Sequence, residues 1–496
     1  MSMNPVVASW ASSSSIRSRI DAEFYTPEAL RKAQWIDDGT HEVRRLQDCL
    51  SLLTDGVHET PGFVDAGVMY LTASNIDECE LNPGKGHKII SEATYIRYDR
   101  MKCAPKAGDV LLSKSGRIGY AAVVPAGLRF AVLHSAAILR PASIDAHFLA
   151  AFLHSRHGQD QIDRFQKGAV QPMLHLEEIA EIRVPKGSPN ILSAIGNKLR
   201  KAERVRRLAV AARQRITDWI ELQASGGMLS AAARRFLDHY PAATIADWTW
   251  VRSLPTADRI DPWPYHVAPR TIVGHLTAHG TSTRLANLAK RATSSRRRIT
   301  FTDRNAPGHY ISVLDIGPTG AIDWSNAQAS RYEGAGIELK PGDILFSCIN
   351  PNQPRVAVIP AGVPGLLVGS PEFAVLNPSA ESSSRHPNLF ATVLRSEWVR
   401  VQVTFRTRSS SLSRRRIEEH DLDDVLIPWF EDDLEELEAL AVHMISENIE
   451  ATRLIAEATL LVDQFIEGTG DEGALIAESD SIERWLAENP IPNQEE

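Results

Sequence analysis

The chain has 496 residues, enough for two to four domains of about 100–200 residues each. Hydrophobic residues make up 43% and charged residues 23%, as in ordinary globular proteins, and neither an 18-residue apolar run nor a signal-peptide pattern is present, so we expect no membrane helix and no secretion. The four cysteines are scattered without a CxxC pair, which argues against a disulfide framework or a cysteine-based zinc site and favours a reducing, cytoplasmic location.

The net charge of −8 is unevenly distributed along the chain. Residues 430–496 contain 2 basic and 19 acidic residues, a net charge of −17, so the preceding 429 residues carry +9. The body of the protein is therefore basic enough for nucleic acid to be a partner.

An internal repeat spans the chain at a spacing of about 240 residues. Short segments recur in the same order with offsets between 234 and 243 residues. The matched pairs are Arg19–Asp21 with Arg259–Asp261, Arg45–Leu46 with Arg284–Leu285, 70–76 with 310–316, 108–113 with 342–347, 123–127 with 358–362, Leu153–Ser155 with Leu394–Ser396, and 179–185 with 422–428. Seven pairs in one order predict two copies of one domain.

Each copy has the pattern of a mixed α/β domain. Short β-rich runs such as VLLS and ILFS are bounded by Gly, Pro and Asp, as strands between turns are. Residues 146–165 and 388–405 are predicted to be helical. The Gly-Asp before each buried strand is interpreted as a turn signal without a further role.

A long helix is predicted after each copy, over residues 191–223 and 431–466. In the second helix, nine of ten residues at alternating spacings of three and four are apolar, as in a coiled-coil seam, and the first helix has a shorter series of the same kind. The second-helix series is Leu434, Leu437, Ala441, Met444, Asn448, Ala451, Ile455, Ala458, Val462 and Phe465; the first is Ala202, Val205, Ala209, Ala212, Ile216 and Trp219. One helix is basic and the other acidic, so we expect them to pair; the alternative is that each packs on its own domain.

The sequence at this point resembles the specificity subunit of Type I restriction-modification systems over roughly residues 15–468. The similar segments are 52–76 with its D-G-x-H-x-x-P pattern, 106–125, 168–185 and, in the second copy, GDILFSCINPNQPRVAVIP. The resemblance implies an α+β fold in which two tandem mixed α/β target-recognition domains are each followed by a long helix, and the two helices pair as an antiparallel coiled coil. The second copy lacks the D-G-x-H-x-x-P pattern, as two domains that read different sequences would.

Five segments follow from this organisation. They are a first target-recognition domain over 1–187, a first spacer helix and linker over 188–240, a second target-recognition domain over 241–429, a second spacer helix over 430–468, and an acidic C-terminal tail over 469–496, within which 479–488 could form a short helix.

Candidate DNA-binding residues lie in loops at equivalent positions of the two copies. Recognition of DNA needs cations for phosphates and polar or Arg side chains for base edges. In the first copy the candidates are Thr54, Asp55, Gly56, His58, Ser113, Lys114, Arg117 and, from the resemblance, Gln171; in the second they are Asn350, Asn352, Gln353 and Arg355. The alternative is that these loops are solvated turns.

The densest basic runs of the second copy are further candidates. They comprise Ser294, Ser295, Arg296, Arg297 and Arg298, together with Arg406 and Arg408 ahead of the triple arginine 414–416. Such a run is often only a solvated surface.

Catalytic motifs are not evident. Asn350-Pro351-Asn352-Gln353 differs from the N-P-P-aromatic tetrad of adenine methyltransferases, and no glycine-rich AdoMet loop follows a plausible first strand. No HExxH motif or His/Cys cluster indicates a metal site.

We therefore expect a non-catalytic DNA-sequence reader with no cofactor or metal of its own. The resemblance implies double-stranded DNA and modification (methyltransferase) subunits as partners, a restriction subunit as a possible third, and S-adenosylmethionine, ATP and Mg²⁺ in those partner subunits. Two alternatives stay open: a stand-alone methyltransferase or nuclease with an unrecognised site, and a coiled-coil scaffold that does not read DNA.

Overall fold

The computed structural model describes residues 22–37, 42–83, 86–167, 172–225, 267–278, 282–292, 298–301, 308–327, 334–351, 353–407 and 415–490. The chain forms two compact units. Unit 1 contains residues 1–205 and 450–496, and unit 2 contains residues 206–449. Each unit thus takes one half of both long helices, so the division into recognition domains and spacers stays a prediction.

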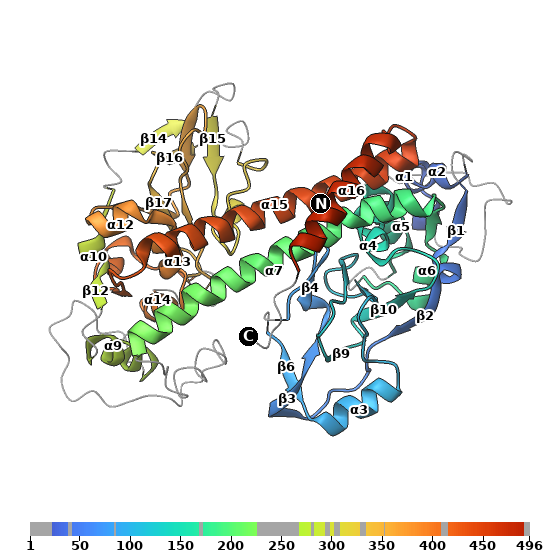
Figure 1. Cartoon of the computed structure of the whole chain (residues 1–496), viewed down its shortest axis with the longest axis horizontal. Helices are drawn as coiled ribbons and strands as arrows, with labels where there is room; N and C mark the ends of the chain where they lie inside the picture. The colour runs from blue at the N-terminus through green and yellow to red at the C-terminus, as the bar shows by residue number, and fades with distance from the viewer. Residues whose placement is uncertain are drawn as a thin grey trace, which may run out of the picture. The chain divides into compact units, whose positions relative to one another are not determined.

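Unit 1 contains a central antiparallel sheet in the order β2-β10-β7-β8, of which β2 and β10 are labelled in Figure 1. A two-stranded sheet, β1-β11, lies at the start of α7, and a smaller sheet has the order β6-β3-β9. The strands are β1 (Val43–Arg45), β2 (Leu50–Asp55), β3 (Phe63–Leu71), β4 (Ile76–Asp77), β5 (Glu80–Leu81), β6 (Lys88–Ile90), β7 (Val110–Ser113), β8 (Ala121–Val123), β9 (Phe130–Val132), β10 (Ala136–Pro141) and β11 (Arg183–Pro185). All four residues of β7 are buried, which is why this strand is continuously apolar up to Ser113.

Unit 2 repeats this arrangement. Its central sheet has the order β13-β20-β17-β18, and its two-stranded sheet pairs β12 with β21. The strands are β12 (Ser282–Arg284), β13 (Ala289–Arg291), β14 (Arg298–Phe301), β15 (Gly308–Ile311), β16 (Gly334–Glu338), β17 (Ile344–Ser347), β18 (Val356–Val358), β19 (Leu366–Gly369), β20 (Phe373–Pro378) and β21 (Leu426–Pro428). The expectation of two copies of one domain is confirmed by the matching strand orders.

The equivalence extends to single side chains. Gln161 donates to the carbonyl of Arg183 at 2.9 Å and accepts from its N–H at 2.7 Å; Gln402 makes the same two bonds with Leu426 at 2.7 and 2.9 Å. In both Gly-Asp turns the carboxylate accepts a backbone N–H three residues earlier, from Lys106 at 2.7 Å and Lys340 at 2.8 Å. Gly-Asp is thus a turn signal, as interpreted, but it has a further role: Asp109 also pairs with Arg140 at 2.7 Å, and Asp343 also accepts from Asn377.

The smaller sheet is where the copies diverge. Both retain one parallel strand pair, β3 with β9 and β15 with β19. In unit 1 the third strand, β6, pairs with β3, and α3 (Glu92–Arg100) follows it. In unit 2 the additional strands β14 and β16 are attached on the β19 side instead. The copies therefore share a framework and differ in what is added to it.

The predicted helical segments 146–165 and 388–405 each form two helices. They are α4 (Ala146–His154) and α5 (Arg156–Phe165) in unit 1, and α13 (Pro387–Leu394) and α14 (Glu397–Thr404) in unit 2. A serine begins the second helix in each case, because its extended backbone ends the preceding turn. The remaining helices are η1 (Ala22–Tyr25), α1 (Pro27–Lys32), α2 (Gln34–Asp37), η2 (Leu46–Cys49), η3 (Ala73–Asn75), α6 (Leu176–Glu181), α9 (Val267–Ala278), α10 (Leu285–Leu288), η6 (Val313–Asp315), α12 (Glu381–Arg385) and η8 (Glu419–Leu422).

The two long helices are α7 (Pro189–Ser225) and α15 (Leu434–Glu467), close to the predicted bounds. In unit 1, Lys198 pairs with Glu457 at 2.9 Å and Lys201 with Glu450 at 3.6 Å. In unit 2, Arg215 pairs with Glu436 at 2.5 Å, and Ala212 packs on Met444. Within each unit, residues later in α7 contact residues earlier in α15, so the helices pair antiparallel, as expected. Every apolar residue of both predicted seams is buried.

The acidic C-terminal segment forms a helix longer than the predicted 479–488. Helix α16 (Glu472–Glu488) buries Leu475 and Ile482 and lies against α7. Asn197 of α7 donates to Ser479 at 2.9 Å and to Glu483 at 2.8 Å, and Lys198 is ion-paired with Glu478. The basic character of α7 thus explains where this acidic helix packs.

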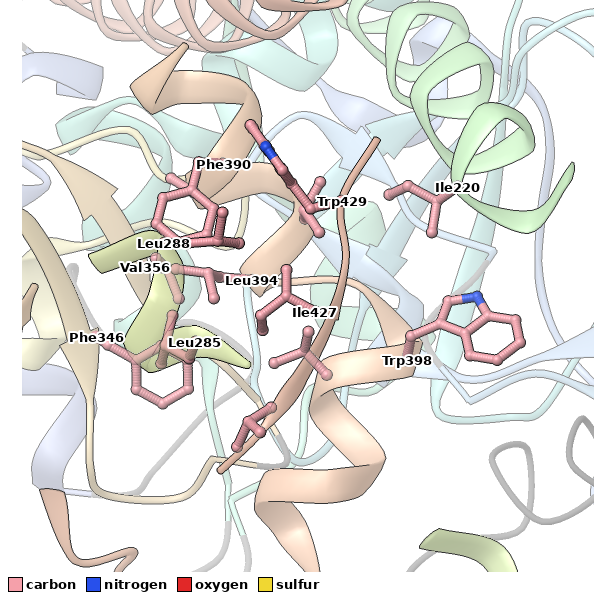
Figure 2. Packing of buried hydrophobic residues seen from close by; sticks show 14 of the residues in the cluster. Ile220, Leu285, Leu288, Phe346, Val356, Phe390, Leu394, Trp398, Ile427 and Trp429 are labelled. Atoms are coloured by element: carbon pink, nitrogen blue, oxygen red, sulfur yellow. The ribbon is translucent and has the colours of Figure 1, made fainter. Parts of the chain in front are cut away.

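Each unit has its own hydrophobic core. In unit 1 the core joins the central sheet, α4 and the facing residues of α7 and α15. In unit 2, Figure 2 shows Phe390, Trp429 and Ile427 packed together, and Trp398 and Ile220 of α7 belong to the same cluster. Aromatic pairs such as Phe390 and Trp429, with ring centroids 5.3 Å apart, fill this core edge to face.

Candidate nucleic-acid interface

The candidate residues of unit 1 lie where strands of the central sheet end. The loop between β7 and β8 is closed by Ser113, which is fully buried. Its Oγ donates to the carbonyl of Arg117 and accepts the N–H of Tyr120 at 2.9 Å. Ser113 therefore fixes the loop from inside, and the exposed residues of the loop are Gly116 and Arg117.

Lys114 and Asp55 come together although they are 59 positions apart in the sequence. The Nζ of Lys114 lies 2.9 Å from Oδ2 of Asp55, and Lys114 is only 5% exposed. The same carboxylate oxygen lies 3.2 Å from Nε2 of His58. The structure thus joins the predicted segments 54–58 and 113–117 into one cluster, in which the ammonium of Lys114 already has an anionic partner.

His58 is the exposed member of this cluster. Its side chain is 71% exposed, and its ring stacks on that of His134 with centroids 4.8 Å apart and an interplanar angle of 14°. A ring held by a carboxylate on one side and a second ring on its face has few rotamers left. It can present a fixed donor or acceptor to a base edge.

Thr54 and Gly56 position this cluster. Thr54 pairs with Ile138 in the sheet, and the N–H of Gly56 donates to Ala136 at 3.2 Å. A Cβ on Gly56 would lie 2.1 Å from the carbonyl oxygen of Val132, so only glycine fits here. Thr54 and Gly56 are thus held in place by the backbone bonds of the sheet, and their contact with DNA stays a prediction.

Arg117 is the accessible cation of the same loop. Its Nη1 lies 2.7 Å from Oδ1 of Asp77, and its guanidinium lies 3.9 Å from the ring centroid of Tyr120. The side chain is nevertheless about half exposed. An arginine oriented by a carboxylate and an aromatic face suits bidentate contact with guanine or a phosphate.

In unit 2 the equivalent loop lies between β17 and β18. Asn350 has φ +48°, a left-handed conformation that asparagine tolerates, and its N–H donates to Arg415 at 2.8 Å. Gln353 is exposed, and its N–H donates to Asn350 at 2.8 Å. Arg355 donates to the carbonyl of Ile316, so its guanidinium is partly engaged. Gln353 is thus the most accessible described candidate of this loop.

The two loops make equivalent backbone hydrogen bonds at Lys114 and Cys348. The N–H of Lys114 donates to Ser135 and its carbonyl accepts from Leu174; Cys348 makes the same bonds with Glu372 and Ile417. Cys348 therefore stands where Lys114 stands, and burial raises the pKa of its thiol to about 12. One copy has an ion pair at this position and the other a neutral thiol.

Several candidates are not placed by the structure. Outside the described residues lie Gln171, Ser294, Ser295, Arg296, Arg297, Asn352 and Arg408. Arg298 begins β14, and its side chain is also outside the description. Arg406 donates to the carbonyls of Asp421 and Asp424, both at 3.2 Å. Contact of any of these residues with DNA stays a prediction.

Sequence reasoning missed three residues that shape the interface: His134, Asp77 and Tyr120. His134 orients His58, and Asp77 and Tyr120 orient Arg117. His134 and Asp77 lie 40 or more positions from the residue they orient, and Tyr120 lies at the far end of the Arg117 loop. Sequence periodicity cannot predict contacts between such distant residues, but the glycines just before Tyr120 do predict a loop there. Among the described residues, no group of three or more His, Cys, Asp or Glu side chains could hold a metal, and no helix could span a membrane.

Comparison with known proteins gives matches only among solved structures, since no family model and no curated protein matches. One is the Type I restriction-modification S subunit from M. genitalium, with 12% identity, 90% of this chain and 96% of that chain covered, and a TM-score of 0.36. Another is the HsdS subunit from Thermoanaerobacter tengcongensis, with 15% identity, 90% and 96% covered, and a TM-score of 0.23. A third, from a Type I restriction-modification complex, has 15% identity, 88% and 97% covered, and a TM-score of 0.24. Over about nine-tenths of its length the chain is thus similar, at low TM-scores, to S subunits of Type I restriction-modification systems, the family that its motifs resemble.

Proposed function

We propose that this chain is the DNA-recognition subunit of a Type I restriction-modification system. In this role it reads a bipartite DNA target and directs methyltransferase and restriction subunits to that target, without catalysing a reaction itself. Methyl transfer and cleavage, with S-adenosylmethionine, ATP and Mg²⁺, belong to the partner subunits.

One observation carries the proposal: two copies share a framework down to single hydrogen bonds and differ in the loops attached to it. Gln161 and Gln402 make the same pair of bonds, whereas Lys114 is replaced by Cys348 and the smaller sheets differ. A conserved frame with different loops is what two readers of different base sequences need, because base-edge contacts are made by loop side chains.

The test is an exchange of the second target-recognition domain. Residues 241–429 are replaced by the equivalent part of a relative, the subunits encoded by neighbouring genes are supplied, and methylated sites are mapped across a genome. One half of the target should change while the other half stays the same. A change in both halves would contradict independent readers.

The same preparation separates the two alternatives. A stand-alone enzyme would methylate DNA with S-adenosylmethionine, or cut it with Mg²⁺, as the purified chain alone. A scaffold that does not read DNA would leave methylation without sequence preference even with all subunits present. The proposal requires no activity from the chain alone and a defined target from the complex.

A further inference from the structure

Arg117, the accessible cation of the loop between β7 and β8, is held on two sides by segments that meet at one histidine. Oδ1 of Asp77 lies 2.7 Å from its Nη1 on one side, and the ring centroid of Tyr120 lies 3.9 Å from its guanidinium on the other. Both segments contact His154, the last residue of α4. The contacts of this histidine therefore bear on the direction in which Arg117 points.

The Asp77 side is the hairpin between β4 and β5. Asp77 pairs with Glu80 across a two-residue turn. Cys79, the second residue of that turn, has φ +52°, a left-handed conformation that is uncommon for a residue with a Cβ and needs support from its surroundings. Its N–H lies 3.2 Å from Nε2 of His154, so the histidine holds the turn that follows Asp77.

The Tyr120 side is attached to the same nitrogen. Ala121, the first residue of β8, has its backbone N and O atoms both 3.0 Å from Nε2 of His154. The rings of His154 and Tyr120 also meet edge to face, with centroids 5.9 Å apart and an interplanar angle of 75°. Because β8 is at the edge of the central sheet, its open side leaves backbone groups that need such a partner.

A neutral imidazole suits this arrangement. Burial lowers the pKa of His154 and outweighs the opposing effects of the Ala121 carbonyl and of Glu78. With its proton on Nδ1, the ring has one acceptor, Nε2, and it can accept the N–H groups of both Cys79 and Ala121. A single nitrogen therefore joins the hairpin turn to β8.

Unit 2 joins the same two segments with different residues. Three positions correspond: Asp77 with Gly317, Tyr120 with Arg355, and His154 with Arg395. Arg395 donates to the carbonyl of Val356 in β18 at 2.7 Å, and Arg355 donates to the carbonyl of Ile316, directly ahead of the turn. The join is thus common to both copies, and in unit 1 it holds an arginine between a carboxylate and an aromatic ring.

We propose that His154 is a positioning residue for DNA recognition by unit 1. By joining the hairpin turn to β8, it fixes the direction in which Arg117 meets a base edge. A base edge offers its acceptors in one direction, whereas many rotamers can reach a phosphate, so an arginine held on two sides suits the base edge. This inference rests on the proposed function and adds the residue that fixes one contact in the half of the target that unit 1 reads.

The first experiment measures the join in the purified chain without DNA. Amide hydrogen exchange is compared for the native chain, His154→Met and His154→Gln, whose side chains are similar in size. Gln can accept the two N–H groups at about the reach of Nε2, whereas Met is at most a weak acceptor. Exchange at Cys79 and Ala121 should rise about fivefold in His154→Met, as for the loss of one hydrogen bond, and stay near the native rate in His154→Gln.

Strand β2, at the opposite edge of the central sheet, is the control for this measurement. Its exchange should be the same in all three proteins. Unchanged exchange at Cys79 and Ala121 in His154→Met would overturn the positioning role. An equal rise in β2 would overturn it as well, because the substitution would then destabilise the whole unit rather than release the join.

The second experiment measures recognition in the complex with the subunits encoded by neighbouring genes. Methylation rates are compared on the native target and on duplexes with single base-pair changes in either half. His154→Met and Arg117→Met should lose discrimination at the same base pair of one half, by roughly tenfold, and the double variant should lose no more than Arg117→Met. His154→Gln should keep the discrimination, and the other half of the target is the internal control.

The outcomes separate this inference from the function on which it rests. A native complex without a defined target would contradict the proposed function, and the role of His154 in recognition with it. A defined target that His154→Met methylates with unchanged discrimination, or with the same loss on every duplex, would overturn the inference alone. The inference also fails if the effects of His154→Met and Arg117→Met multiply, because His154 would then not act through Arg117.

Discussion

At the scale of single residues, the cluster of Lys114, Asp55 and His58 combines two roles. Lys114 was predicted as a DNA-contacting cation, yet it is buried and bound to Asp55, while His58 and Arg117 are the exposed members of the same surface. A buried, ion-paired lysine supports the loop, so we expect phosphate or base contacts from its exposed neighbours rather than from Lys114. Loss of a supporting residue should lower the stability of the fold, whereas loss of a phosphate contact should change the salt dependence of DNA binding. The two roles can therefore be separated by experiment.

Lys114→Met should destabilise unit 1 by about 3 kcal/mol, because it leaves the largely buried carboxylate of Asp55 without its cation. Lys114→Met combined with Asp55→Asn should lose less than Lys114→Met alone, since no uncompensated charge remains. Urea unfolding measures both. Arg117→Met is the matched control: its pair with Asp77 is half exposed, so it should cost under about 1 kcal/mol.

DNA binding gives the complementary readout. If Arg117 contacts a phosphate, Arg117→Met should reduce the slope of log affinity against log salt by about 0.9 in the assembled complex. Lys114→Met should leave that slope unchanged. A reduced slope for Lys114→Met would mean that the ammonium leaves Asp55 to contact DNA.

Asp463 of α15 lies 2.6 Å from Nδ1 of His157 and makes a pH-dependent contribution whose sign follows from its pKa. Burial opposes ionisation of Asp463, but the bonds from His157 and Arg156 prevail and lower its pKa. A carboxylate with a folded-state pKa below its ordinary value of 3.8 stabilises the fold above that value, and the contribution disappears as pH falls through the folded-state pKa. The stability gap between the native chain and Asp463→Asn should therefore be constant above pH 4 and close below it. Unfolding by urea at several pH values tests this, with the exposed Asp480→Asn as control. A gap independent of pH down to pH 2 would contradict the assigned contact.

At the scale of elements, the side chain of Gln161 bonds α5 to β11, and that of Gln402 bonds α14 to β21. Gln161→Ala and Gln402→Ala should each cost about 1–3 kcal/mol, because each leaves a backbone donor and acceptor of the strand without a partner. Urea unfolding and amide exchange at Arg183 and Leu426 are the measurements. Gln166→Ala, whose side chain bonds an exposed neighbour, serves as the neutral control. A loss in one copy without a similar loss in the other would argue against their equivalence.

Much of the element pattern could be predicted from the sequence because it depends on local periodicity. The long helices lie within three residues of their predicted bounds, and every apolar seam residue is buried. What could not be predicted depends on contacts between distant segments. The first turn of α16 buries Leu475 in the unit 1 core, and the pairing of Lys114 with Asp55 needs the sheet to be assembled. The candidate loops could therefore be read from the sequence, whereas the contacts that their residues make with one another could not.

At the scale of the whole molecule, the paired helices predict how the target is spaced. Seven residues inserted after Val205 in α7 and seven after Ile449 in α15 would keep the pairs inside each unit, because both insertions fall at the unit boundary. The added length is about 10 Å at 1.5 Å per residue. Under the proposed function, the gap between half-sites should lengthen by about three base pairs at roughly 3.4 Å each.

Genome-wide methylation mapping reads out this change, with both half-site sequences expected to stay the same. The control is the insertion in α7 alone, which shifts Ala209 and Ala212 against Met444 and should abolish methylation. An unchanged gap in the double insertion would show that the helices do not set the spacing.

The division of both helices between the units also determines the order in which the chain can fold as it is synthesised. Unit 2 is one uninterrupted stretch, 206–449, whereas unit 1 also requires residues 450–496, which are synthesised after unit 2. Ala202 and Val205 therefore remain without the α15 residues of the unit 1 core, among them Ala451 and Ile455, through the synthesis of all of unit 2. Unit 1 is begun before unit 2 and completed after it, so the nascent chain exposes the unit 1 part of the apolar stripe of α7 while unit 2 is being made.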